Sequence, residues 1–267
     1  MRPPTPRRER ILAYGGPGAG KTRAWLTIAD LYAKTKTPAK FYVIDTDDTY
    51  WASVEEFPAV ATSGMVHPEI VFDFPSYQAA AEKFKSVATE DDWIICDMFD
   101  KGWEEVQSYY SERVFGKDKG DFFLSMRKEM EESKKKSKNF QPFEGWTDWT
   151  VIKPLHAEWA NDIIFRHKAH VFLTAGVKPV SRSGTMKDSK DIIDAFGHIG
   201  ARPAGEKGLA AHGVNSVLMF SQTRTGEEWV IDTAKDRGGR TPMIKAPAGN
   251  FAMSYLVKVA GWDLAAK

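Results

Sequence analysis

The chain contains Gly15-Gly16-Pro17-Gly18-Ala19-Gly20-Lys21-Thr22 between an apolar run at 10–14 and a stretch of helical spacing at 21–34. This segment fits the phosphate-loop pattern G-x-x-x-x-G-K-[ST] at every fixed position. Glycines let the backbone curl around a phosphate with its N–H groups pointing inward, and the next helix turns its positive dipole end toward the same anion. The pattern predicts an ATP-binding loop in which Lys21 contacts the β- and γ-phosphates and Thr22 binds Mg²⁺. The alternative is a glycine-rich strand–helix turn with an incidental lysine.

Short apolar runs alternate with helical stretches along the rest of the chain. We expect strands at 10–14, 41–44, 69–74, 93–97, 170–175, 214–220 and 229–233, and helices at 21–34, 77–88, 102–115 and 150–167. Strands separated by helices predict an α/β fold with a mostly parallel central sheet and helices on both faces. The last two strands are close enough in sequence to form an antiparallel hairpin at the sheet edge.

An acidic residue closes one of these strands. Asp97 follows Trp93-Ile94-Ile95-Cys96, which is the Walker B pattern of apolar residues and then an acid. Ligands bind at the carboxyl ends of strands in α/β sheets, so we expect Asp97 near the phosphate loop, on the Mg²⁺ side.

A nucleoside triphosphatase also needs a second carboxylate, which orients the water that attacks the γ-phosphate. Asp45, Asp47 and Asp48 follow the strand at 41–44 and are candidates, although Asp45 can instead cap the turn. A solvated acidic loop is the plainer interpretation. Asp100 and the pair Glu104–Glu105 are competing candidates.

The remaining sequence predicts one ATPase domain, 10–267, after a flexible basic arm, 1–9. Two stretches, 116–145 and 178–207, are expected to be long loops. The spacing of Phe123, Met126 and Met130 indicates a short amphipathic helix within the first of them.

The two stretches are also rich in charged residues. Residues 116–138 hold eight basic against five acidic residues, and 178–207 hold six against four. Such cationic side chains can bind the phosphates of a nucleic acid, and Phe122, Phe123 and Phe140 can stack on bases. Charged loops that merely stay soluble are the alternative.

Composition limits the possible functions. Among 267 residues, 37 basic and 36 acidic side chains give a net charge of +1, which excludes a globally basic nucleic-acid coat. A single cysteine, Cys96, cannot form an internal disulfide and is typical of a reducing compartment. No run approaches 18 apolar residues, so we expect no membrane helix and a cytoplasmic protein.

The order of these motifs resembles that of the RecA-like P-loop ATPases. It is most similar to the short phage ATP-binding proteins that consist of a RecA core and act in single-strand annealing. Residues 15–22 match the Walker A loop and 94–97 match Walker B. Val43-Ile44-Asp45-Thr46-Asp47 resembles the family's strand ending in I-D-x-[DE], whose last acid activates water. The resemblance, which covers roughly 10–247, therefore assigns that role to Asp47, with Asp in place of the commoner Glu.

Two further elements follow from the resemblance. Thr233-Ala234-Lys235-Asp236-Arg237 resembles the K-x-R element that reaches a neighbouring subunit's γ-phosphate, which implies that Lys235 and Arg237 act in trans. The alternative is a solvated hairpin end. Thr174 takes the place of a polar sensor, and 178–207 takes the place of a DNA-binding loop.

The resemblance implies a Mg²⁺-dependent ATPase that acts on single-stranded DNA in recombination or annealing. It also implies self-association into a ring or filament, in the cytoplasm of a host cell if the protein is phage-encoded. Two other functions stay open: an ATP-gated assembly or loading factor with little turnover, and a small-molecule kinase whose lid would use arginines such as Arg182 and Arg202.

Overall fold

The computed structural model describes residues 8–48, 50–132, 143, 147–184, 187–208, 213–237, 243–247 and 250–262. The strands are β1 (Arg10–Gly15), β2 (Phe41–Asp45), β3 (Val66–Ile70), β4 (Trp93–Asp97), β5 (His170–Ala175), β6 (Val177–Pro179), β7 (Ala201–Pro203), β8 (Ser216–Gln222), β9 (Glu228–Asp236) and β10 (Met243–Pro247). The helices are α1 (Lys21–Thr35), α2 (Tyr50–Val54), α3 (Pro58–Ser63), α4 (Phe74–Val87), α5 (Phe99–Phe115), α6 (Lys119–Glu132), α7 (Trp149–Ile164), α8 (Lys190–Phe196) and the C-terminal π-helix η1 (Ala252–Val257).

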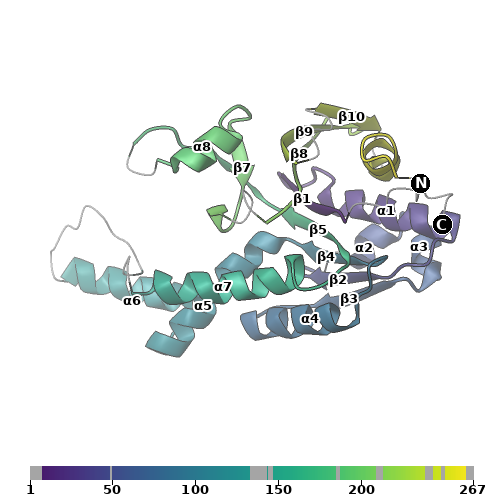
Figure 1. Cartoon of the computed structure of the whole chain (residues 1–267). Coiled ribbons are helices and arrows are strands. Elements are labelled where there is room, and N and C mark those ends of the chain that lie inside the picture. The colour runs from purple at the N-terminus through teal and green to yellow at the C-terminus, as the bar shows by residue number, and fades with distance from the viewer. Residues whose placement is uncertain are drawn as a thin grey trace.

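One sheet of eight strands organises the molecule, in the order β10-β9-β8-β1-β5-β4-β2-β3 (Figure 1). The pairings from β3 through to β8 are all parallel, whereas β9 runs antiparallel to both β8 and β10. The predicted α/β class is confirmed, with its mostly parallel sheet and its antiparallel hairpin at one edge. The edge strand β10 was not predicted.

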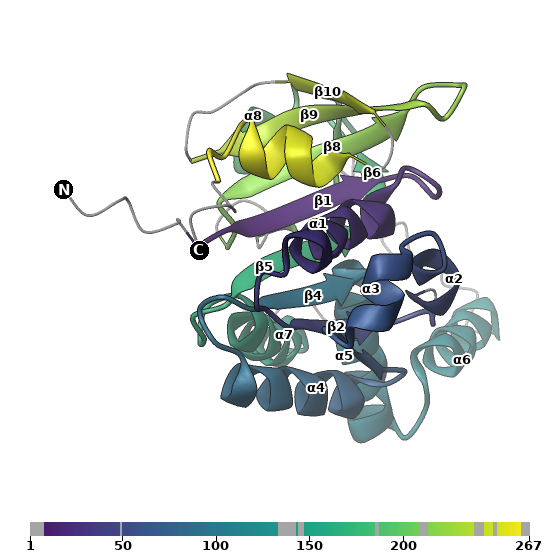
Figure 2. The ribbon, with the colours of Figure 1, turned by 90° about the vertical axis from the view of Figure 1, so that its right-hand side faces the viewer.

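Helices cover both faces of the sheet, because side chains along each inner strand alternate between two cores. In β1, Leu12 and Tyr14 belong to the core under α4, α5 and α7, while Ile11 and Ala13 belong to the core under α1 and η1. Figure 1 shows α4, α5 and α7 together on one side, and Figure 2 shows the C-terminal helix in yellow near α1. The strands are therefore buried on both sides, as parallel strands usually are.

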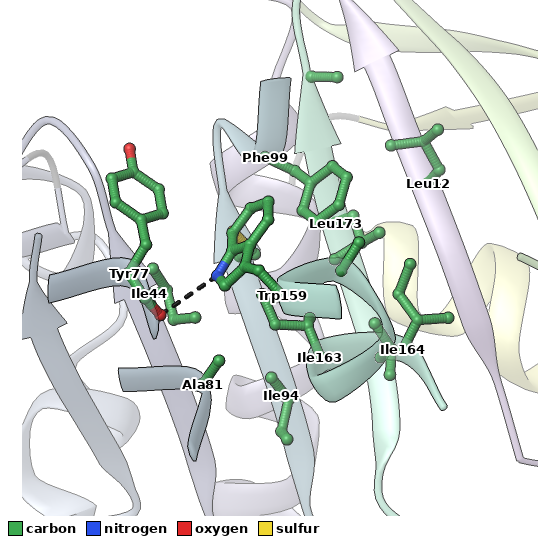
Figure 3. Packing of buried hydrophobic residues seen from close by; sticks show 14 of the residues in the cluster. Leu12, Ile44, Tyr77, Ala81, Ile94, Phe99, Trp159, Ile163, Ile164 and Leu173 are labelled. Atoms are coloured by element: carbon green, nitrogen blue, oxygen red, sulfur yellow. Dashed lines mark hydrogen bonds between the residues drawn. The ribbon is translucent and has the colours of Figure 1, made fainter. Parts of the chain in front are cut away.

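Trp159 of α7 lies in the middle of the core under α4, α5 and α7 (Figure 3). Its ring stacks on Phe99 with centroids 4.8 Å apart, and its indole N–H donates to the Tyr77 carbonyl at 3.2 Å. A Cβ on Gly102 of α5 would lie 2.3 Å from this ring, so the glycine lets α5 approach α7. This contact fixes the start of α5, next to the end of β4, against the sheet.

Element boundaries differ from the prediction where β3 meets α4. The expected strand at 69–74 lies earlier, at Val66–Ile70, and the helix expected at 77 already begins at Phe74. Asp73 and Ser76 form a reciprocal capping box, and a proline stands in the first helical turn. These residues favour a helix start over a strand, which the apolar pattern alone did not indicate.

The two predicted loops contain regular structure. The stretch 116–145 includes α6, in agreement with the helix expected from Phe123 and Met126, so the loop prediction was wrong there. The stretch 178–207 includes α8 and most of the β6–β7 ribbon. Phe140 lies outside the described residues.

The predicted arm is also shorter than expected. Arg8 donates to the carbonyls of Ala169 (2.6 Å) and Ile164 (2.8 Å), and Glu9 is buried beside His170. Both residues are therefore part of the fold, while residues 1–7 of the predicted arm lie outside the described residues. None of the helices in the described part of the chain combines the length and the apolar character needed to cross a membrane.

Candidate nucleotide-binding site

A cleft of about 740 Å³ opens at the carboxyl ends of the parallel strands. It lies where β1, β2, β4, β5 and β8 end, the edge at which α/β sheets bind ligands. Its lining consists of Gly15, Gly16, Pro17, Gly18, Ala19, Gly20, Lys21, Thr22, Arg23, Asp47, Ser53, Glu56, Phe57, Asp97, Met98, Gly176, Val177 and Gln222. The fold thus brings the predicted phosphate loop together with two of the predicted carboxylates, Asp47 and Asp97.

The phosphate loop depends on its glycines. Gly18 and Gly20 have φ values of 70° and 89°, which residues other than glycine rarely adopt. A Cβ on Gly20 would also lie 2.1 Å from the Trp229 indole nitrogen, and one on Gly15 would lie 2.4 Å from the Phe220 carbonyl oxygen. The hairpin β8–β9 therefore packs directly against the loop and supports its shape.

Lys21 is a buried cation at the start of α1, with 9% of its surface exposed. Its Nζ donates to the carbonyls of Gly15 and Gly16, both at 3.0 Å. Burial lowers the pKa of the ammonium, and the charges of Asp97, Asp100 and Asp47 oppose this effect. A desolvated ammonium held by neutral carbonyls at a helix N-terminus is suited to bind an anion.

Asp97 is buried at the end of β4 and is held by two side chains. The Thr174 hydroxyl donates to Oδ1 at 2.5 Å, and the Trp25 indole N–H donates to Oδ2 at 3.1 Å. Thr174 is fully buried and also accepts from the Met98 N–H at 2.7 Å. Thr174 therefore positions Asp97 behind the cleft and is not one of the residues that line it, in contrast to the sensor role expected for it.

The acids after β2 have different roles. Asp45 is buried and accepts from the N–H groups of Asp47 (3.3 Å) and Tyr50 (3.2 Å), so it caps the turn. Asp47 is exposed in the cleft, with a carboxylate oxygen 3.9 Å from Lys101 Nζ. Asp48 is exposed with φ 54° and is not among the residues of the cleft wall. Of the two exposed acids, Asp47 rather than Asp48 is among the described residues that line the cleft.

Three residues of the site were missed at the sequence level. Trp25 lies one helical turn after Lys21 and binds Asp97. With its amide oriented to satisfy both neighbours, Gln222 donates to the Gly18 carbonyl (3.0 Å) and accepts from the Trp229 indole (2.8 Å). Arg23 lines the cleft, where its guanidinium lies 5.5 Å from the Phe57 ring and pairs with Glu56. A polar residue just beyond the strand predicted at 214–220 was the available signal for Gln222.

Lys235 and Arg237 lie far from their own phosphate loop. Lys235 pairs with Val217 near the start of β8, whereas Gln222 at the other end of β8 contacts the loop. At about 3.3 Å per strand residue the separation is roughly 15–20 Å. Burial lowers the pKa of Lys235 to about 8, and the charges of Arg237 and Arg10 add to this effect. The pair is therefore placed at the opposite end of the sheet from the cleft of its own chain.

The donor atoms around the loop suit a hard divalent cation. Thr22, which is partly exposed and lines the cleft, has a hydroxyl oxygen. Asp97 has a carboxylate whose two oxygens each keep a lone pair beyond the hydrogen bonds described above. Mg²⁺ prefers such oxygen ligands and usually retains several waters. The residues predicted to hold it, Thr22 and Asp97, thus fit that ion by chemistry.

Comparison with known proteins gives few leads. No protein-family model matches the chain, and no curated protein is similar to it in sequence. Among solved structures, the chain is similar to the crystal structure of the RadB recombinase, with 10% identity and a TM-score of 0.49 over 89% of this chain and 86% of that chain. The chemistry of the cleft must therefore be inferred from its own residues.

Replacing Trp25 with Phe tests how Asp97 is held. The change keeps a buried ring but removes the N–H that Oδ2 accepts, and hydrogen bonds to charged groups contribute about 1.5–3 kcal/mol. We expect the free energy of unfolding to fall by about that amount in denaturant titration. Trp93→Phe is the matched control, because the Trp93 indole donates to the neutral Tyr32 hydroxyl at 3.3 Å and should cost about 1 kcal/mol. Equal losses in the two variants would contradict a charged partner for Trp25.

Proposed function

We propose that this chain is a Mg²⁺-dependent ATPase of the RecA-like type, which acts on single-stranded DNA in recombination or annealing and assembles into a ring or filament. One observation carries the nucleotide part of the proposal. The glycine loop, the buried Lys21 ammonium and the Asp97 carboxylate share one cleft with Asp47 at the carboxyl edge of the sheet. A triphosphate requires this combination of a cradle, a cation and acids.

Each residue of the cleft has a distinct task in this proposal. The N–H groups of the loop and the Lys21 ammonium bind the phosphates, and the α1 dipole favours the same charge. Bound Mg²⁺, held through Thr22 and Asp97, would supply charge neutralisation at the phosphates. Asp47 orients the attacking water from the exposed side of the cleft. Trp25 and Thr174 keep Asp97 in place from behind.

The DNA part of the proposal is supported by the unit formed by β6, α8 and β7, which extends beyond the end of β5 (Figure 1). Asp188 is buried within it and pairs with Arg202 and Lys207, so these two cations stabilise the unit. Lys178, Lys187 and Lys190 are exposed and are suited to contact phosphates of a nucleic acid.

An ATP-gated assembly or loading factor with little turnover is the second candidate. Its support is the Asp47 carboxylate, which is short, exposed and 3.9 Å from the Lys101 ammonium. A small-molecule kinase is less well supported. Arg182 donates to the Gly197 carbonyl and Arg202 to Asp188, and neither is among the described residues that line the cleft.

Replacing Lys21 with Ala tests the nucleotide site. The change removes the cation that would face the β- and γ-phosphates, so we expect ATP affinity to fall by about an order of magnitude or more. Calorimetric titration with ATP and Mg²⁺ measures the effect, and circular dichroism checks the fold. Lys34→Ala is the control, since Lys34 lies in the same helix but pairs with Asp30 on the surface. Unchanged ATP affinity in Lys21→Ala would rule out the phosphate-loop assignment.

Mixed assemblies test the trans pair. Arg237→Ala and Asp47→Asn should each be inactive in isolation. A mixture should regain part of the ATPase rate, because one type of interface then joins an intact cleft to an intact Arg237 from the neighbour. An arginine supplied in trans contributes about 10³-fold or more in related phosphoryl transfers, so the recovery is measurable in a steady-state assay. No recovery despite co-assembly in analytical ultracentrifugation would show that the pair does not act across subunits.

The pH profile provides a separate test of Lys235. Because the pKa of Lys235 in the single chain is lowered to about 8, its ammonium is mostly charged at pH 7 and mostly neutral at pH 9. Catalysis across subunits requires assembly, so part of the ATPase rate should rise with protein concentration. If the Lys235 charge is required, that part should fall as pH rises, by about tenfold one pH unit above the pKa. Lys235→Arg, which stays charged, should flatten the profile. A profile identical in both proteins would exclude Lys235 as the titrating group.

A further inference from the structure

Asp100, in the first turn of α5, lies between the cleft and the unit formed by β6, α8 and β7. Its Oδ2 accepts a hydrogen bond from the Gly176 N–H at 3.2 Å. Gly176 follows β5 directly, leads into β6 and also lines the cleft. Asp100 is thus hydrogen-bonded to Gly176, a residue of the cleft wall.

The unit returns to the core against the same side chain. A Cβ on Gly205, two residues after β7, would lie 3.1 Å from the Asp100 Cβ, and a Cβ on Gly176 would lie 3.1 Å from Oδ2. Gly205 has φ 88°, so glycine is required there for conformation as well as for space. Both ends of the unit therefore rest on Asp100.

Hydrogen bonds and ion pairs within the unit hold its parts together. A movement of its two ends would therefore also displace its exposed residues. Asp188 accepts from Arg202 (3.3 Å), from Lys207 (2.6 Å) and from the Ser181 N–H (2.9 Å). These bonds tie the connection before α8 to the strand β7 and to Lys207, which follows it. A shift at Gly176 and Gly205 is consequently transmitted to Lys178 and Lys190, which are exposed.

The Asp100 carboxylate is only partly satisfied. Its Oδ1 is inaccessible and has no hydrogen-bond partner among the described protein groups, and the same holds for His156 Nε2. Both residues line a cavity of about 10 Å³ together with Gly205 and Glu206. Burial and the charge of Glu104 raise the pKa of Asp100, while the N–H groups of Gly176 and of Asp100 itself, and then the Lys21 charge, lower it. A buried carboxylate with one oxygen that lacks a well-aligned hydrogen bond can adopt a second arrangement when the nearby charge changes.

We propose that Asp100 is a positioning residue that couples the charge at the phosphate loop to the placement of the unit formed by β6, α8 and β7. The inference rests on the proposed nucleotide site. An anion at the loop offsets the Lys21 charge that attracts Asp100, which alters the hold of Asp100 on Gly176. By thermodynamic linkage, a ligand bound to the exposed lysines of the unit changes nucleotide affinity by the same factor.

Hydrogen exchange, measured by mass spectrometry with and without a non-hydrolysable ATP analogue and Mg²⁺, tests the coupling. In the wild-type protein we expect the analogue to change exchange severalfold in peptides that contain Gly176–Pro179 and 201–205. Asp100→Asn keeps an oxygen that accepts from Gly176 but removes the charge. It should therefore show wild-type exchange without nucleotide and lose the response to nucleotide. A purely structural role would alter exchange without nucleotide and leave the response in place.

Two further variants complete the design. Glu112→Gln removes an exposed charge from the same helix far from the unit, and its response should equal that of the wild type. Gly176→Ala crowds Oδ2 from the other side and should weaken the response, which gives a second test if Asp100→Asn does not fold. A full response in Asp100→Asn, or no response in a wild-type protein that binds the analogue, overturns the coupling. Failure of the wild-type protein to bind the analogue in calorimetry overturns the proposed function, and the coupling with it.

Discussion

The burial of one carboxylate, Asp97, constrains the arrangement of the whole site. A charge removed from water must be hydrogen-bonded or paired, and here the bonds come from different parts of the chain. Trp25 reaches Asp97 from α1 on one side, and Thr174 reaches it from the neighbouring strand β5. Satisfying Asp97 thus fixes the distance of α1 from β4 and the register of β4 with β5. The phosphate loop immediately precedes α1, so its position relative to the acid follows from the same contacts.

Parallel pairing then determines which side chains can cooperate. Five strand ends meet at the cleft, and each contributes a residue to its wall or to the support of that wall. The antiparallel turn of β9 has the opposite effect, because it carries Lys235 and Arg237 back to the far end of the sheet. Gln222 and Lys235 belong to the same hairpin but therefore lie at opposite ends of the sheet. Within one chain only the first can influence the loop.

The sequence predicted the sheet, most of its strands and the cleft residues of 15–22, because these depend on local patterns: apolar runs, a glycine motif and acids at strand ends. Asp47 and Asp97 were placed at the right edge for the same reason. Most of the wrong or missing predictions concern contacts between distant residues. Trp25 was not singled out, and Thr174 was expected to act as a polar sensor, because only the fold shows that both bind Asp97. The stretch 178–207 looked like a loop because its order comes from the buried Asp188 and its two cations rather than from apolar periodicity. The start of α4 was missed although its capping residues were visible.

The central position of β1 has a consequence for how the protein is made. This strand is synthesised well before both of its partners: Arg10 pairs with Val171, and Ile11 pairs with Ser216. Until those segments leave the ribosome, β1 has two unpaired edges and an apolar sequence, the condition under which nascent chains aggregate or engage chaperones. The loop after β1 also lacks its support from Gln222 and Trp229 until that time. A truncated chain would thus carry the complete nucleotide motif and still lack the surroundings that shape it.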